Sequence, residues 1–165
     1  ACLLIAEFRK TEDTIDTSKK HLLLVNPSDA GNLGTIMRTA LAFNIRNIAI
    51  IPPAVDHFDP KTVRASMGAL FHLNIQIYPD FAAYEAQNQN HTTYAFMLNK
   101  SAETILEASQ HKSEPWTIVM GNEAAGLPKE YEKLCKSVYI PQSDDVDSVN
   151  LSIATALALY EFTKK

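Results

Sequence analysis

Short apolar runs alternate with segments of helical periodicity along most of this chain. Runs of four to six mainly apolar residues, without strict alternation of apolar and polar positions, occur at 21–25, 47–51, 75–78, 93–98, 116–120 and 137–140. Such runs are typical of parallel strands that are covered on both faces. They predict a sheet with helices on both sides.

Between these runs, apolar residues recur at the spacing of a buried helix face. The segments with this spacing are 33–43, 62–69, 81–87, 102–108 and 148–162. Asp80 and Ser101 are the expected N-caps of the third and fourth helices, and Asp147 or Ser148 that of the last. Pro128 can open a further short helix, and residues 87–91 look like a solvated loop. The alternation predicts an α/β fold with a mostly parallel sheet flanked by helices.

Composition fits one globular domain. Of the 165 residues, 46% are hydrophobic and 21% are charged, which excludes disordered, collagen-like and disulfide-rich classes. No apolar run approaches the roughly 18 residues of a membrane helix, and no signal peptide is recognisable. Cys2 and Cys135 lack neighbours at metal-ligand spacing, so we expect reduced thiols, no metal site and a cytoplasmic location.

The first residues differ from the rest. The stretch from Cys2 to Phe8 looks like an apolar strand or linker, residues 9–21 are charged and polar, and the chain lacks an initiator Met. We therefore expect residues 1–21 to form an N-terminal strand and linker, consistent with the remnant of an upstream part. Residues 22–165 are expected to form the folded domain.

Polar residues suited to chemistry follow the predicted strands, where α/β proteins bind ligands. After the first strand comes Asn-Pro-Ser-Asp-Ala-Gly-Asn-Leu-Gly-Thr-Ile-Met-Arg-Thr-Ala, with glycines that permit a tight turn at the helix entrance. Asn32 and Arg38 stand six residues apart in it, so they can share a site if Asn32 lies in the loop before the helix. The alternative is a capped helix with a surface arginine.

Two further loops carry similar candidates. The segment Ile-Val-Met-Gly-Asn-Glu-Ala-Ala-Gly-Leu-Pro places Gly121 and Glu123 at a strand end. The segment Tyr-Ile-Pro-Gln-Ser-Asp-Asp-Val-Asp-Ser-Val-Asn-Leu-Ser places Ser148 and Asn150 at a helix start. The alternatives are a turn with a solvated carboxylate and an ordinary helix cap. Phosphate-loop, dinucleotide-binding, hydrolase-elbow and zinc motifs are missing from the sequence.

In their joint order, these segments resemble the three signature motifs of the SpoU/TrmH-like RNA 2′-O-ribose methyltransferases of the SPOUT superfamily. The resemblance covers roughly Leu22 to Phe162, so residues 22–165 would be the methyltransferase domain. It implies a C-terminal trefoil knot, a homodimer and S-adenosylmethionine (AdoMet) as cofactor. The implied reaction is methyl transfer to a ribose 2′-hydroxyl of tRNA or rRNA, with neither a metal nor a membrane involved.

The resemblance also implies roles for individual residues. Arg38 matches the catalytic arginine, Asn32 its supporting asparagine, Glu123 the second-motif carboxylate, and Ser148 and Asn150 the third-motif polar pair. The residues implied to hold the cofactor are Leu98, Gly121, Ile140, Ser148 and Leu151. The chain departs from the family pattern at Gln142, where an apolar residue is usual, and at Val149, where leucine is usual. Gln142 could alter one wall of the cofactor pocket.

The formal net charge of −4 argues against a strongly basic nucleic-acid binder, but the charge is unevenly spread. Residues 31–72 contain four basic and two acidic residues, whereas residues 112–147 contain four and seven. Arg38, Lys61 and Arg64 are therefore the expected RNA contacts, and a solvated helix face is the alternative for Lys61 and Arg64. Binding dominated by phosphate contacts weakens steeply with salt.

Other functions stay open at this point. One is a knotted module that binds AdoMet and RNA but is inactive alone and needs a missing upstream RNA-binding domain. Another is a small flavodoxin-like or nucleotide-binding protein, which leaves the three motifs unexplained. The small residues Ala154, Ala156 and Ala158 on the last helix permit close packing, either across a homodimer interface or within the core.

Overall fold

The computed structural model describes Glu7, Lys10 and residues 13–164. Its sheet has seven strands in the order β3-β2-β1-β6-β4-β7-β5, and every neighbouring pair is parallel. The strands are β1 (His21–Val25), β2 (Asn47–Ile51), β3 (Asn74–Ile77), β4 (Thr92–Phe96), β5 (Glu103–Thr104), β6 (Trp116–Met120) and β7 (Lys136–Tyr139). The predicted α/β fold with a parallel sheet is confirmed.

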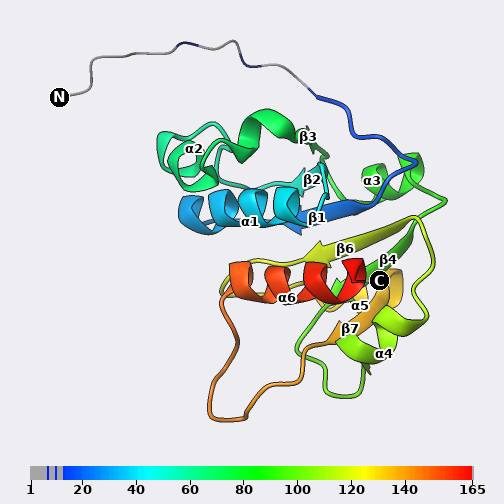
Figure 1. Ribbon diagram of the computed structural model, residues 1–165. Coiled ribbons are helices and arrows are strands. Elements are labelled where there is room, and N and C mark those ends of the chain that lie inside the picture. The colour runs from blue at the N-terminus through cyan, green and yellow to red at the C-terminus, as the bar shows by residue number, and fades with distance from the viewer. Residues whose placement is uncertain (1–6, 8–9, 11–12, 165) are drawn as a thin grey trace.

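Helices cover both faces of this sheet. They are α1 (Ala30–Ala42), α2 (Pro60–Ser66), α3 (Phe81–Gln87), α4 (Ile105–Gln110), α5 (Tyr131–Leu134) and α6 (Leu151–Thr163), with the 3₁₀ turn η1 (Ala69–His72). Helices α1, α4 and α6 pack into one hydrophobic cluster, while α3 and α5 pack into the other. Figure 1 shows α1 and α6 lying side by side along the sheet.

The central strands are buried on both faces, which explains their mainly apolar runs. All five residues of β1 are buried, as are those of β2 and β6. Successive side chains of a strand point to opposite faces. Leu22 and Leu24 therefore join the cluster of α1 and α6, whereas Leu23 and Val25 join that of α3 and α5.

The predicted helix at 102–108 was wrong at its start. Residues 103–104 form the short strand β5, and α4 begins only at Ile105. Its N-cap is Thr104, not Ser101. The Thr104 side chain accepts a hydrogen bond from the backbone of Glu107, and the Glu107 carboxylate accepts one from the backbone of Thr104. This reciprocal pair satisfies two free N–H groups and fixes the helix start.

Other boundaries also differ. The last helix begins at Leu151 and is capped by Asn150 rather than Asp147 or Ser148. Helix α2 runs over 60–66 instead of 62–69, and α5 begins at Tyr131 rather than at Pro128. Within the expected solvated loop at 87–91, Asn88 is buried and donates a hydrogen bond to the carbonyl of Tyr84.

The expected strand or linker at 2–8 lies outside the described residues, apart from Glu7. Within the part of the chain that the structure describes, no helix has the length and apolarity to cross a membrane. The same part contains no group of three or more His, Cys, Asp and Glu residues placed to hold a metal ion.

Candidate active site

A cavity of about 300 Å³ opens at the carboxyl edge of the sheet. It is lined by the loops that follow β4, β6 and β7 and by the start of α6. From β1 the chain continues to β2 and β3 on one side of the sheet and then crosses to β4 on the other side, so the strand order reverses between β1 and β6. The carboxyl edge at such a reversal is the usual ligand site of open α/β sheets. The lining includes all five residues expected to hold the cofactor, namely Leu98, Gly121, Ile140, Ser148 and Leu151.

Gly121 stands where the backbone of the loop after β6 folds back on itself. A Cβ atom at this position would lie 2.3 Å from the carbonyl carbon of Gly126 and 2.4 Å from the nitrogen of Leu127. The backbones of Asn122 and Gly126 exchange two hydrogen bonds, of 3.1 and 3.0 Å. The Asn122 side-chain oxygen accepts from the backbone N–H groups of the two alanines between them. Only glycine fits this close approach.

Glu123 braces the loop after β1 rather than standing free in the cavity. One carboxylate oxygen accepts from the Ser28 hydroxyl at 2.7 Å and the Ser28 backbone at 3.1 Å, and the other from the Asp29 backbone at 3.1 Å. The Asn122 amide donates to Glu123 and also to the carbonyl of Asn26, at 2.9 Å. Because Asp29 is the N-cap of α1, this bridge fixes where α1 begins.

The same contacts decide the charge of Glu123. Burial is the largest single influence and favours the neutral form, but the hydrogen bonds from Ser28, from the Glu123 backbone and from Asp29 together outweigh it. The pKa of the Glu123 carboxyl therefore lies below its ordinary value. An ionised carboxylate that already accepts several hydrogen bonds is poorly suited to remove a proton from a substrate.

A second polar link joins the first and third polar loops. Asn150 caps α6 by accepting hydrogen bonds from the backbone and hydroxyl of Ser152. Its amide donates to the side-chain oxygen of Asn32 at 3.2 Å. Asn32 lies inside α1, and its backbone N–H donates to the capping Asp29. Helices α1 and α6 are thus connected by these side chains at the cavity edge of the sheet.

Arg38 lies away from these links. Asn32 is in the helix, so the condition for a shared site with Arg38 is not met, and six helical positions place the two side chains roughly 120° apart. Arg38 is exposed, does not line the cavity, and makes no hydrogen bond or ion pair with the described residues. On neighbouring α2, the Lys61 ammonium donates to Asp29 at 3.3 Å, while the Arg64 side chain is exposed.

Sequence reasoning missed the residues that hold the loops together. Ser28 and Asn122 were not singled out, although both follow buried strands and carry side chains that bond readily to backbone groups. Their partners lie more than ninety positions away in the chain. The two departures from the family pattern, Gln142 and Val149, both line the cavity. The Gln142 amide donates to the carbonyl of Asp147 at 3.3 Å.

Replacing Glu123 with glutamine is expected to lower the free energy of unfolding by about 1–3 kcal/mol, because an amide NH₂ would face backbone donors and leave them unpaired. Urea denaturation at pH 7 measures this loss. Glu85→Gln, at an exposed position, is the matched control and should change stability by less than about 0.5 kcal/mol. An equal effect of both substitutions would show that the bridge does not stabilise the fold.

The bridge also has a defined pH range. The folded-state pKa of Glu123 is lowered, so its contribution to stability is fully present above the ordinary carboxyl pKa of 4.5. That contribution is lost as the pH falls through the lower, folded-state pKa. The carboxylate is ionised throughout the neutral range, so it should not shape an activity profile there.

Comparison with known proteins adds independent information. Residues 19–160 match the model of the SpoU rRNA Methylase family. The 23S rRNA (guanosine(2553)-2′-O)-methyltransferase RlmP of Bacillus subtilis is 31% identical over 155 residues, which are 90% of this chain and 60% of that protein. The AdoMet-bound rRNA methyltransferase from Sinorhizobium meliloti has a TM-score of 0.80 at 33% identity, covering 87% of this chain and 55% of that one.

A further solved structure is the SpoU methyltransferase AviRb from Streptomyces viridochromogenes in complex with AdoMet. Its TM-score is 0.78 at 26% identity, with 90% of this chain and 61% of that chain covered. The chain described here spans about 55–61% of the length of these three proteins.

Proposed function

The chain belongs to the SpoU rRNA methylase family, and from this premise we propose that it transfers the methyl group of AdoMet to a ribose 2′-hydroxyl of tRNA or rRNA. One observation carries the proposal. An apolar cavity at the carboxyl edge of the sheet is tied by Glu123 and Asn150 to the helix that bears Arg38. The relatives named above, which are rRNA methyltransferases, support the reaction class.

The cavity suits the cofactor in size and character. Its volume of about 300 Å³ lies at the lower end of the range for small-molecule sites. Leu98, Ile140 and Leu151 supply apolar walls, and Gly121 brings the backbone close without a side chain. When bound, AdoMet supplies a methyl group on a positively charged sulfur, with a neutral thioether as leaving group. In this proposal the walls exclude water and orient that group.

We propose that Arg38 acts on the RNA. A guanidinium keeps its charge at neutral pH and can hold a phosphate through two parallel hydrogen bonds. In this position it would also stabilise negative charge that develops on the 2′-oxygen as its proton leaves. Three residues lie in the links that fix α1 against the cavity, namely Asn32, Glu123 and Asn150. Ser148 lines the same cavity. In this proposal all four act as positioning residues.

The proposed RNA surface continues from α1 onto α2. Arg64 is exposed there, and Lys61 pairs with Asp29 through an ion pair whose side chains are both largely solvated. Such a pair is weak, so a phosphate can replace Asp29 as the partner of Lys61. The C-terminal knot is part of the same proposal and follows from the family resemblance.

Incubation of the chain with radiolabelled AdoMet and either tRNA or rRNA tests the activity. The expected product carries label on a ribose, seen as a dinucleotide that resists alkaline hydrolysis because its 2′-hydroxyl is blocked. Label on a base would contradict the reaction. Binding of AdoMet without transfer would favour the alternative, a module that needs a separate RNA-binding domain.

We also propose a homodimer that uses the exposed side of α6. Ile153, Leu157 and Tyr160 are 52%, 42% and 55% exposed and recur at the spacing of one helix face. Ala158, by contrast, is fully buried and belongs to the core of the subunit. The Tyr160 ring contacts Phe43 at the end of α1, with ring centroids 6.3 Å apart. The apolar stripe therefore reaches the helix that carries Arg38.

Leu157→Asp is expected to convert the dimer into a monomer, because a carboxylate would be buried without a partner in the interface. Light scattering coupled to size-exclusion chromatography measures the mass. Leu106→Asp, which changes a leucine of similar exposure on α4, is the control and should leave the dimer intact. A wild-type chain that is monomeric at micromolar concentration would overturn the proposal.

A further inference from the structure

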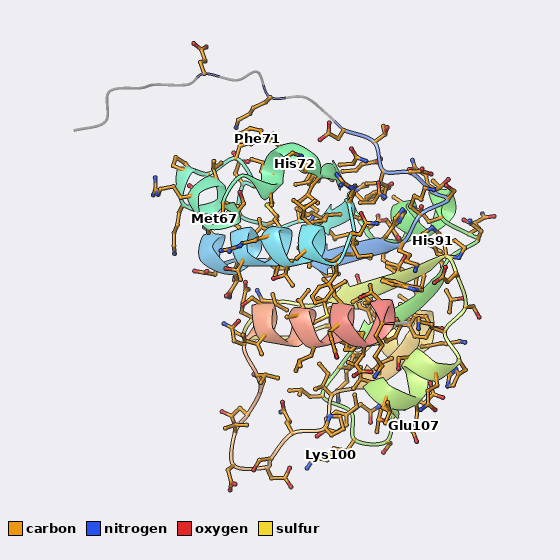
Figure 2. The ribbon with its side chains drawn as sticks, viewed as in Figure 1. Met67, Phe71, His72, His91, Lys100 and Glu107 are labelled. Carbon is orange, nitrogen blue, oxygen red and sulfur yellow. The ribbon has the colours of Figure 1, made fainter. Side chains whose placement is uncertain are left out.

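A second polar cluster lies at the opposite, amino-terminal edge of the sheet. It contains His21 at the start of β1, Tyr84 on α3, His91 before β4 and Thr117 on β6. His21 and Thr117 are completely buried, and Tyr84 is buried as well. None of these side chains lines the cavity. Figure 2 labels His91, which precedes β4, and Lys100, which follows the carboxyl end of β4, and the two lie far apart in that view.

These four side chains form one unbroken chain of hydrogen bonds. The imidazole of His21 contacts the carbonyl of Asp16 at 2.9 Å through Nε2 and the hydroxyl of Tyr84 at 2.8 Å through Nδ1. The hydroxyls of Tyr84 and Thr117 are 2.6 Å apart.

The chain continues through the second histidine. His91 contacts the Thr117 hydroxyl at 2.8 Å through Nδ1 and the carbonyl of Thr17 at 2.9 Å through Nε2. Both ends of the network are therefore carbonyl oxygens of the segment that leads into β1.

The number of protons does not match the number of hydrogen bonds. Each of the five contacts needs one hydrogen between its two heavy atoms. A neutral histidine has one N–H group, and tyrosine and threonine have one O–H each, so the four neutral side chains supply four hydrogens. Both terminal carbonyls can only accept. In the fully neutral network one close contact must therefore join two lone pairs, whereas one added proton completes all five bonds.

We propose that this cluster is a proton-binding site that takes up one proton on His91 and thereby fastens residues 16–17 to the amino-terminal edge of the sheet. With His91 cationic, both of its nitrogens donate, to Thr117 and to the Thr17 carbonyl. Thr117 then donates to Tyr84, Tyr84 to His21, and His21 to the Asp16 carbonyl. In this arrangement each of the five contacts has one hydrogen between its two heavy atoms.

We place the proton on His91 because its side chain is only partly buried, whereas that of His21 is completely buried. Burial, opposed by the bond to the Asp16 carbonyl, lowers the pKa of His21 to about 4. Burial also lowers the pKa of His91, against bonds to the carbonyls of Thr17 and Trp116 that raise it. Burial raises the pKa of Tyr84 well above its usual value, so its hydroxyl keeps its hydrogen.

Other titratable groups near the network do not supply the missing hydrogen. The Asp16 carboxylate is occupied by the backbone and hydroxyl of Ser18, and Lys19 acts on it as a nearby positive charge. On the α3 side, Tyr78 and Cys135 face Tyr84, and burial raises the pKa of both. A second proton is disfavoured, because the rings of His21 and His91 lie 4.2 Å apart and two cations would repel.

Tyr84→Phe gives a sharp test, because the Tyr84 hydroxyl is linked to His91 through Thr117. Without the Tyr84 hydroxyl three contacts remain, and His21, His91 and Thr117 supply one hydrogen each. A proton on His91 then completes no missing bond. The pKa of His91, followed by NMR of its ring protons, is expected to fall by about one pH unit, a tenfold loss of proton affinity. Tyr78→Phe is the control, because its hydroxyl bonds to Gln87 outside the network, and it should leave the pKa of His91 unchanged.

A measurement on the unaltered chain decides the matter even if Tyr84→Phe fails to fold. Nitrogen-15 shifts distinguish a ring nitrogen that carries hydrogen from one that does not. Across the first titration step, both nitrogens of His91 should become protonated while Nδ1 of His21 stays bare. Independent titration of the two histidines, or the same His91 pKa in Tyr84→Phe as in the unaltered chain, would overturn the proposal.

Discussion

Arg38→Ala is expected to slow methyl transfer by about 100- to 1,000-fold, the usual loss when one group that stabilises transition-state charge is removed. AdoMet affinity should stay within about twofold, because Arg38 does not line the cavity. The exposed guanidinium bonds to none of the described residues, so its removal leaves no buried group unpaired. Single-turnover rates and AdoMet calorimetry on the same preparations separate the two effects.

Two controls make the result specific. Arg64→Ala removes another exposed arginine from the neighbouring α2 and should weaken RNA binding without slowing the bound complex. Arg38→Lys keeps a positive charge but loses the planar pair of donors. A near-normal rate for Arg38→Lys would show that bidentate geometry is not what Arg38 contributes. A normal rate for Arg38→Ala would remove it from the mechanism.

Gly121→Ala is expected to weaken AdoMet binding by roughly 30- to 150-fold, equivalent to about 2–3 kcal/mol. The added Cβ would lie 2.3–2.6 Å from backbone atoms of Gly126 and Leu127, and these cannot move without disturbing the hydrogen bonds between Asn122 and Gly126. The cavity lining includes Gly121, Asn122, Gly126 and Leu127, so any backbone movement that removes the clash also changes the shape of the cavity. Calorimetry with AdoMet measures the loss.

Gly126→Ala is the matched control on the same loop. A Cβ there would meet no atom within 4 Å, but the residue has a φ of +67°, which costs an alanine about 1–2 kcal/mol. That strain should lower the stability of the fold while changing AdoMet affinity less than Gly121→Ala does. If the two variants bind AdoMet equally weakly, general strain in the loop, rather than close approach at Gly121, explains the loss.

Much of the fold could be predicted because the signals are local. The runs at 21–25, 47–51 and 116–120 match β1, β2 and β6 at both ends, since strands buried on both faces are mainly apolar. Helix α3 was also predicted correctly, with Asp80 as its cap. Errors occurred where several capping residues stood close together. Thr104 rather than Ser101 caps α4, because only Thr104 has a glutamate three residues later to complete the reciprocal pair.

The candidate site could be predicted in its position but not in its connections. Parallel strands bring their carboxyl ends to one edge, so polar loops after successive strands had to meet there. The residues expected to hold the cofactor do line one cavity. The sequence alone could not show that Glu123 braces Ser28, or that Asn32 lies inside α1 and bonds to Asn150. These pairings depend on how the loops pack.

The sequence by itself determined the alternation of strands and helices, the burial of the central strands and the family to which the chain belongs. These follow from periodicity and from motifs that each span a few residues. Only the tertiary structure decided which side chains are bonded and which stay exposed. It bonded Glu123 to Ser28, left Arg38 facing solvent, and joined His21 to His91 through Tyr84 and Thr117. The physical reason is that such contacts join residues 26 to 118 positions apart, and packing of the sheet and helices brings these together.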